Sequence, residues 1–187
     1  MSRLSRERIQ IALSPRQVAM VRFSSQRHSK QVTQRRCLPC APGDQQPNWS
    51  GALASLRELL KPPNPVKLPV TVILSNHFVR YMVLQWSTDL VTRAEEAEFS
   101  RARFIQVFGD IARHWTIRAS DAPGGHARLA AATDQALLEA LATTLNATGL
   151  ALDSCQPALM AQFNAGRRRI GDNAWLVCAE HGRLLVA

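Results

Sequence analysis

The sequence predicts an α/β fold, in which helices flank a mixed sheet, and two features of the chain lead to that prediction. The first is Val70–Leu74, a continuous, largely β-branched run of the kind expected of a strand buried on both faces of a sheet. The second is the alternation along the chain of strand patterns with period two and helix patterns with period 3.6. The hydrophobic content of 46% and charged content of 20% are those of a globular domain.

The first part of the chain is expected to form a three-stranded antiparallel meander. Ile9, Ile11 and Leu13 alternate along one face of the first strand, and Ser14-Pro15 predicts the turn that follows it. The three predicted strands are 8–13, 17–23 and 30–38.

Helix signals are clearest at two places. Trp49, Leu53, Leu56 and Leu60 are spaced 4-3-4, which puts them on one face of a helix over 49–60. Thr92-x-x-Glu95 is a capping box and predicts a second helix that continues to Phe108, with Phe99, Ile105 and Phe108 as its larger apolar groups. The other predicted elements are strands 78–84, 115–120, 128–132, 150–155, 174–179 and 183–186, a helix that begins at Thr133 or Asp134 and ends before Gly149, and a short helix 157–164.

The most informative position is the junction between the strands 70–74 and 78–84. There a core strand ends at Ser75-Asn76, and His77 connects it to a second strand. Such a junction is expected to form a rigid, exposed corner, and we expect partner proteins to bind at this corner.

Three stretches carry a resemblance to a known family. Ser75-Asn76-His77-Phe78-Val79-Arg80-Tyr81, followed by Leu84 and Trp86, resembles the actin-like cytoplasmic domain shared by the L protein of type II secretion and the M protein of type IV pilus assembly. The segments Ile11–Val21 and Cys155–Asn164 resemble the same family and keep its order along the chain. One departure is Gln85, where the family tends to have Pro before the Trp.

The resemblance implies a fold and a domain organisation. The implied fold is the ribonuclease-H-like fold of the actin-like ATPase superfamily, and a three-strand meander followed by helix, strand, helix and strand suits that fold. Residues 1–173 would form the first actin-like half, with an inserted small α+β subdomain at roughly 92–133. Residues 174–187 would be the opening hairpin of a truncated second half.

The resemblance also implies a function. It predicts a non-catalytic scaffold of a bacterial secretion or pilus assembly platform, in the cytoplasm at the inner face of the inner membrane. The expected partners are an assembly ATPase and the cytoplasmic tails of inner-membrane platform proteins, with an anionic membrane surface as a further partner. The residues expected to contact partners are Asn76, His77, Arg80, Trp86 and the basic loop Arg167, Arg168 and Arg169.

Catalysis is not expected, because the first predicted hairpin lacks the groups that it would need. Actin-like ATPases hold metal-bound phosphates there with an acidic residue and a Gly-rich turn, and related nucleases place a metal-binding Asp on the first strand. The hairpin Ile11–Gln17 contains neither Asp nor Gly. We therefore predict no catalytic, cofactor-binding or metal-binding residue, and ATP, a possible cofactor of relatives, is not expected here.

The net charge of +9 is concentrated near the N-terminus. Residues 1–36 hold nine Lys and Arg against Glu7 alone, whereas the rest of the chain holds fourteen against thirteen acidic residues. This pattern suggests either attraction to an anionic surface or a solvated face that keeps the protein soluble. The alternative functions are therefore a nucleic-acid-binding protein that uses the basic N-terminal strands, and a degenerate nucleotide-binding module. Nucleic acid is a less expected partner than the assembly ATPase and the platform-protein tails.

Targeting signals and cysteines add little to this prediction. The sequence has no apolar run of about eighteen residues and no signal-peptide pattern, so a cytoplasmic location is expected. Cys37 and Cys40 form a C-x-x-C motif, but loop residues follow it, whereas redox motifs of this kind open a helix. Structural or incidental thiols are expected there.

Overall fold

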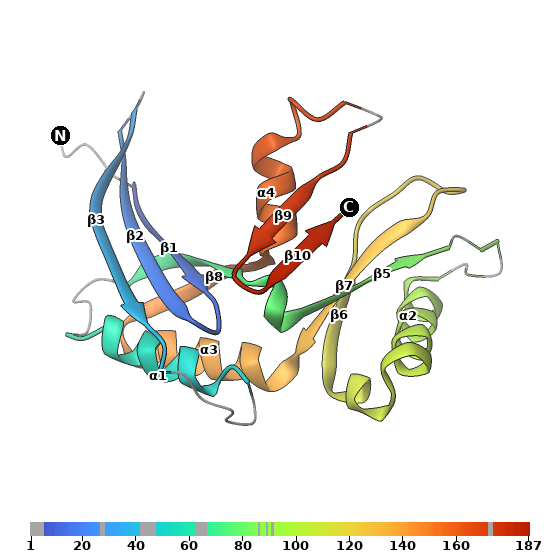
Figure 1. Ribbon diagram of the computed structural model, residues 1–187, viewed down its shortest axis with the longest axis horizontal. Coiled ribbons are helices and arrows are strands. Elements are labelled where there is room, and N and C mark those ends of the chain that lie inside the picture. The colour runs from blue at the N-terminus through green and yellow to red at the C-terminus, as the bar shows by residue number, and fades with distance from the viewer. Residues whose placement is uncertain are drawn as a thin grey trace. The chain divides into compact units, whose positions relative to one another are not determined.

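The computed structural model in Figure 1 describes residues 6–26, 29–41, 48–62, 67–85, 87–88, 90, 92–171 and 174–187. The chain divides into two compact units. Unit 1 comprises Met1–Phe78 and Glu139–Ala187, and unit 2 comprises Val79–Leu138. Unit 2 includes the subdomain expected at roughly 92–133 and also the strand that precedes it.

Unit 1 is built on a five-stranded mixed sheet with the order β3-β2-β1-β4-β8. The first three strands are antiparallel neighbours, whereas β4 runs parallel to both β1 and β8. The strands are β1 (Arg6–Leu13), β2 (Gln17–Gln26), β3 (Ser29–Pro39), β4 (Leu68–Leu74) and β8 (Leu150–Pro157). The predicted meander is confirmed, and each of its strands is slightly longer than the sequence pattern indicated.

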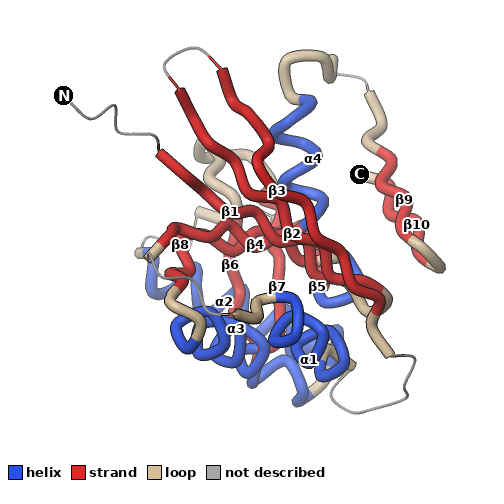
Figure 2. The backbone as a smooth tube through the Cα atoms, turned by 90° about the vertical axis from the view of Figure 1, so that its left-hand side faces the viewer, coloured by secondary structure: helices blue, strands red, loops and turns tan. Residues whose placement is uncertain are grey.

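Helices lie on both faces of this sheet. In Figures 1 and 2, α1 and α3 lie on one side and α4 on the other. The helices are α1 (Ser50–Leu59), α3 (Gln135–Ala147) and α4 (Ala158–Gly166). On the side of α1, the predicted alternation is realised, because Ile9, Ile11 and Leu13 are buried while Arg8 and Ala12 are exposed.

Burial of β4 differs from the prediction. Val70, Val72 and Leu74 are fully buried, but Thr71 and Ile73 on the other face are only half-buried. The strand has neighbours on both edges, β1 along Val70–Leu74 and β8 along its length with one register shift after Val70. One face of β4 therefore belongs to the core. On the other face, Ile73 lines a cavity that is described below.

The outer strand β3 is exposed along most of its length. Val32 and Arg35 are exposed, on the outermost strand of the five-stranded sheet. Charged side chains on an outer strand discourage pairing with other chains.

Unit 2 has its own sheet with the order β5-β7-β6, in which all neighbours are antiparallel. Its elements are β5 (Val79–Leu84), α2 (Arg93–Phe108), β6 (Trp115–Ala119) and β7 (Arg128–Asp134). The predicted capping box is present, because Thr92 Oγ1 accepts from Glu95 N–H at 3.2 Å and Glu95 Oε2 accepts from Thr92 N–H at 2.8 Å.

Phe104 is the centre of the core of unit 2. Its side chain is 0% exposed and packs with Phe108 and Trp115, at ring-centroid distances of 5.7 and 6.5 Å. The sequence pattern drew attention to Phe99, Ile105 and Phe108 and missed this residue. The difference arises because the sheet, rather than the helix alone, decides which side of α2 is buried.

The last two strands, β9 (Val177–Glu180) and β10 (Arg183–Val186), form a hairpin. They pair with each other in a separate two-stranded sheet. Gly182 in the turn has a φ of 72°, a conformation that favours glycine.

The predicted order of strands and helices is confirmed over the whole described chain. The 3₁₀ turns Asn76–Phe78 and Asp110–His114 are the additions. The fold is α/β, with the mixed sheet and flanking helices that the sequence predicted. No helix in the described part of the chain is long and apolar enough to cross a membrane.

Replacement of Phe104 should destabilise unit 2. Phe104→Ala removes a fully buried ring and leaves a cavity, so we expect a loss of about 3–5 kcal/mol in the free energy of unfolding, measured by urea denaturation. Val107→Ala, on the exposed side of the same helix, is the control and should change the stability by less than about 0.5 kcal/mol. Equal effects of the two substitutions would contradict this assignment of the core.

Candidate functional site

Asn76 links three elements of unit 1 at the carboxyl end of β4. Its backbone N–H donates to Glu180 Oε1 at 3.0 Å, and its carbonyl oxygen accepts from Arg183 Nη1. Its side-chain Oδ1 accepts from Leu159 N–H at 3.3 Å, in the first turn of α4. Asn76 therefore holds β4, α4 and the β9–β10 hairpin together, and we call this set of contacts the Asn76 junction.

Ser75 completes the Asn76 junction. Its hydroxyl donates to Glu180 Oε2, so the Glu180 carboxylate receives two hydrogen bonds from the end of β4. Its Oγ also accepts from His77 N–H at 3.2 Å, and its own N–H donates to the carbonyl oxygen of Leu13 at 2.9 Å. Hydrogen bonds to a charged group are stronger than neutral ones, so Glu180 and Arg183 both stabilise the position of the hairpin.

A cavity of about 560 Å³ lies beside the Asn76 junction. Ala12, Ala19 and Ile73 form an apolar part of its lining. The polar and charged residues around it come from the β1–β2 turn, the end of β4, α4 and the terminal hairpin: Ser14, Arg16, Gln17, Ser75, His77, Gln162, Glu180 and His181.

The β1–β2 turn beside this cavity offers few groups for a phosphate. Ser14 N–H donates to the carbonyl oxygen of Gln17 at 3.1 Å, and Gln17 N–H donates to Ser14 Oγ at 3.1 Å. Pro15 has no N–H, which leaves Arg16 as the one backbone amide of the turn outside these bonds. Since phosphate-binding loops supply several converging amides, this turn lacks the required geometry.

The described residues contain no group of three His, Cys, Asp or Glu side chains that could hold a metal ion. In the cavity lining, Glu180 is the single carboxylate, and both of its oxygens accept hydrogen bonds from the Asn76 junction. The arrangement is suited to holding protein segments together rather than to binding a cation.

The prediction of an exposed corner is wrong for Ser75 and Asn76. Asn76 is 0% exposed and Ser75 is buried, because α4 and the terminal hairpin cover the end of β4. His77 is half-buried, and its Nε2 lies 3.0 Å from the carbonyl oxygen of His181.

The other predicted contact residues lie in different parts of the chain. Arg80 is half-buried on β5, where its Nη1 donates to the carbonyl oxygen of Val79 at 3.2 Å. Arg167, Arg168 and Arg169 are exposed in the turn after α4. Trp86 lies outside the described residues. Contacts of all seven predicted residues with partners remain predictions.

Glu180 and Arg183 are the residues of the Asn76 junction that sequence reasoning missed. Their hairpin was predicted, but without a position in the fold. They face each other in the register of β9 and β10, and together they bind a strand end more than a hundred residues earlier in the chain. The only local signal is a pair of opposite charges beside the His181-Gly182 turn, which gives no indication of the partner.

The cysteines are free thiols in unlike surroundings. Cys37 is exposed on β3, whereas Cys40 is buried and its Sγ lies 3.6 Å from the carbonyl oxygen of Ser14. Burial raises the pKa of Cys40, and it raises the pKa of Cys155 to about 11. A raised thiol pKa opposes redox chemistry at Cys40 and Cys155, and the structural or incidental role of the Cys37–Cys40 motif stays a prediction.

Comparison with known proteins finds similarity in structure alone. No protein-family model matches the sequence, and no curated protein sequence matches it. One similar solved structure is the cytoplasmic domain of EpsL, an inner-membrane component of the type II secretion system of Vibrio cholerae. It matches with a TM-score of 0.64 and 11% identity, over 96% of this chain and 66% of that one.

Two further structures share the fold. The PilM–PilN type IV pilus biogenesis complex matches with a TM-score of 0.61 and 15% identity, over 94% of this chain and 54% of that one. A Bacteroides thetaiotaomicron protein with an actin-like ATPase fold and unknown function matches with a TM-score of 0.53 and 11% identity, over 97% of this chain and 68% of that one. The resemblance predicted from the sequence is therefore confirmed at the level of the fold, and the chain spans just under two thirds of the first structure and about half of the second.

Removal of the Glu180 carboxylate should release the terminal hairpin. Glu180→Ala leaves the hydroxyl of Ser75 and the N–H of Asn76 without that acceptor, a cost of about 1–3 kcal/mol. We expect amide hydrogen exchange in Val177–Val186 to become about tenfold faster or more, with little change in β1 and β2. Glu58→Ala, which removes an exposed carboxylate paired with Lys61, is the control. Unchanged exchange in the hairpin would show that Glu180 does not fasten it.

The thiols should differ in reactivity at pH 8. With a pKa of about 11, Cys155 is roughly one part in a thousand thiolate at that pH, and the raised pKa of Cys40 acts in the same direction. Iodoacetamide should therefore modify the exposed Cys37 first, as followed by mass spectrometry of tryptic peptides. Modification of Cys155 at the rate of Cys37 would contradict the burial described above.

Proposed function

We propose that this chain is a non-catalytic cytoplasmic scaffold of a bacterial type II secretion or type IV pilus assembly platform. The observation that carries the proposal is the fold, which matches an inner-membrane component of a secretion system over 96% of this chain and a pilus biogenesis complex over 94%. The partners proposed are an assembly ATPase and the cytoplasmic tails of platform proteins at the inner membrane.

The β1–β2 turn supports the non-catalytic part of the proposal. Phosphate transfer needs cations or several donors placed around the phosphate groups, and Ser14-Pro15-Arg16 contains no carboxylate and no glycine. Two of the turn's backbone amides are already bonded within the turn. We therefore propose that the surface at the β1–β2 turn binds other molecules and does not catalyse phosphate transfer.

Exposed basic groups support the partner-binding part. The Arg167–Arg169 turn offers three exposed guanidinium groups that suit acidic side chains or anionic lipid. Arg8, Arg16 and Arg35 are also exposed, on or beside the meander. These latter residues favour the second candidate function, which is binding of nucleic acid. A steep fall of DNA or RNA affinity with increasing salt is what that function requires.

A pull-down from a bacterial lysate tests the proposal. The immobilised intact chain should retain an assembly ATPase or the tail of an inner-membrane platform protein, identified by mass spectrometry. An Arg80→Ala, Trp86→Ala variant should lose most of that retention, because both residues lie in the stretch that carries the family resemblance.

Arg103→Ala is the matched control, because Arg103 is an exposed arginine of α2 that bonds only to Gln106 among the described residues. This variant should retain the same proteins as the intact chain. Retention of nucleic acid in place of protein, or turnover of a nucleoside triphosphate by the purified chain, would contradict the proposal.

A further inference from the structure

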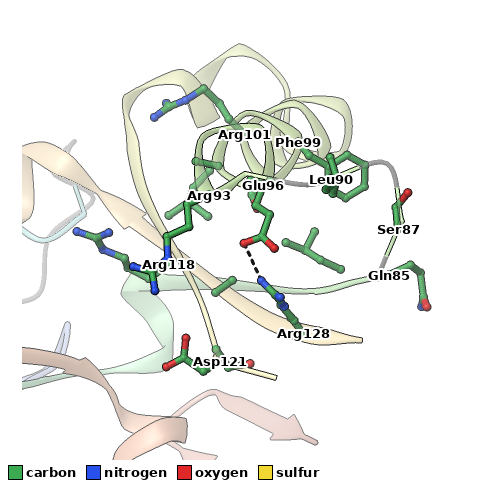
Figure 3. A pocket seen from close by; sticks show the side chains of 16 residues that line it. Gln85, Ser87, Leu90, Arg93, Glu96, Phe99, Arg101, Arg118, Asp121 and Arg128 are labelled. Carbon is green, nitrogen blue, oxygen red and sulfur yellow. Dashed lines mark hydrogen bonds and ion pairs between the residues drawn. The ribbon is translucent and has the colours of Figure 1, made fainter. Parts of the chain in front are cut away.

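Unit 2 contains a second cavity, of about 420 Å³, between α2 and the three-stranded sheet (Figure 3). Its volume falls in the range of ligand-binding sites. The charged residues that line it are Arg93, Glu96, Arg101, Arg118, Asp121 and Arg128, so four positive groups face two negative ones.

Arg128 and Glu96 form the one ion pair across this cavity among its described lining residues. Arg128 Nη1 lies 2.8 Å from Glu96 Oε2, and both side chains are largely shielded from solvent. The buried Nε–H of Arg128 has no acceptor among the described residues. Because buried donors almost always find an acceptor, this N–H is available to an oxygen atom of a ligand or of water.

Arg93 and Arg118 carry the excess positive charge. Figure 3 shows both of them on the same side of the Glu96–Arg128 pair, whereas Arg101 points away from it. Neither Arg93 nor Arg118 forms an ion pair with another described residue. Both side chains are exposed lining residues, and an oxyanion that reaches both guanidinium groups would gain charge-assisted hydrogen bonds from each.

The apolar, polar and acidic residues of the lining decide which kind of oxyanion fits. Leu84 and Ile117 are apolar, and Gln85 and Ser120 can bond to peptide groups. Glu96 and Asp121 would repel a ligand with several negative charges, such as a phosphate cluster. The mixture suits a peptide that brings one carboxylate and an adjacent apolar side chain.

We propose that unit 2 binds an acidic segment of a partner protein in this cavity. A Glu or Asp carboxylate of that segment lies between Arg93 and Arg118, and a neighbouring apolar side chain packs against Leu84 and Ile117. The inference rests on the proposed function only in taking the ligand to be a protein segment, and it concerns a site separate from the Asn76 junction.

Titration of the full chain with N-acetyl-Leu-Glu-amide, whose single carboxylate is that of the Glu side chain, tests this assignment when it is observed by ¹⁵N NMR. We expect saturable shifts at the arginine Nε–H groups of the cavity and at the first amides of α2. Arg93→Gln combined with Arg118→Gln should raise Kd roughly tenfold, because it removes two charge-assisted hydrogen bonds. Arg103→Gln on the same helix is the matched control and should leave Kd unchanged.

Two further probes separate the carboxylate from other ligands. N-acetyl-Leu-Gln-amide, which has no carboxylate, should bind at least tenfold more weakly, and inorganic phosphate should not saturate the same resonances at lower concentration than the Glu dipeptide amide. Equal binding of the two dipeptides, tighter binding of phosphate, or no saturable shift up to about 10 mM would overturn the proposal. The measurement uses the chain and a chemical probe alone, so its outcome is independent of the lysate pull-down.

Discussion

The fold of unit 1 depends on satisfying the backbone where β4 ends inside the protein. A buried N–H or carbonyl without a partner costs about 1–3 kcal/mol, so a core strand that stops at a buried residue needs specific bonds there. Asn76 obtains them from Glu180 and Arg183 of the terminal hairpin, and its side chain in turn bonds to the first turn of α4. The hydrogen bonds of Asn76 therefore link the positions of α4 and the terminal hairpin to the end of β4.

The same constraint bears on function. Glu180 lines the larger cavity, and both of its oxygens are already engaged by Ser75 and Asn76. The β1–β2 turn also lines this cavity, and its Ser14 and Gln17 are bonded to each other. Ser14, Ser75 and Glu180, which line the cavity, are thus used for holding the protein together.

Local patterns predicted the elements well, because the relevant forces act over a few residues. The alternation of Ile9, Ile11 and Leu13 identified β1 and its buried face, and the Thr92–Glu95 capping box identified the start of α2. Phe104 was missed because its burial depends on the sheet of unit 2. The candidate site was predicted less well, since a strand end that appears exposed in sequence is covered by the terminal hairpin, and no short-range pattern reports a contact of that kind.

The Asn76 junction also has a consequence for biosynthesis. The bonds from Ser75 and Asn76 to Glu180 span 105 and 104 residues of sequence. During translation the end of β4 leaves the ribosome long before its acceptor, whereas unit 2 depends on contacts within one continuous segment. A nascent chain must therefore keep a partly assembled sheet with an open end until the last hairpin emerges, and chaperone dependence is expected to concentrate in that interval.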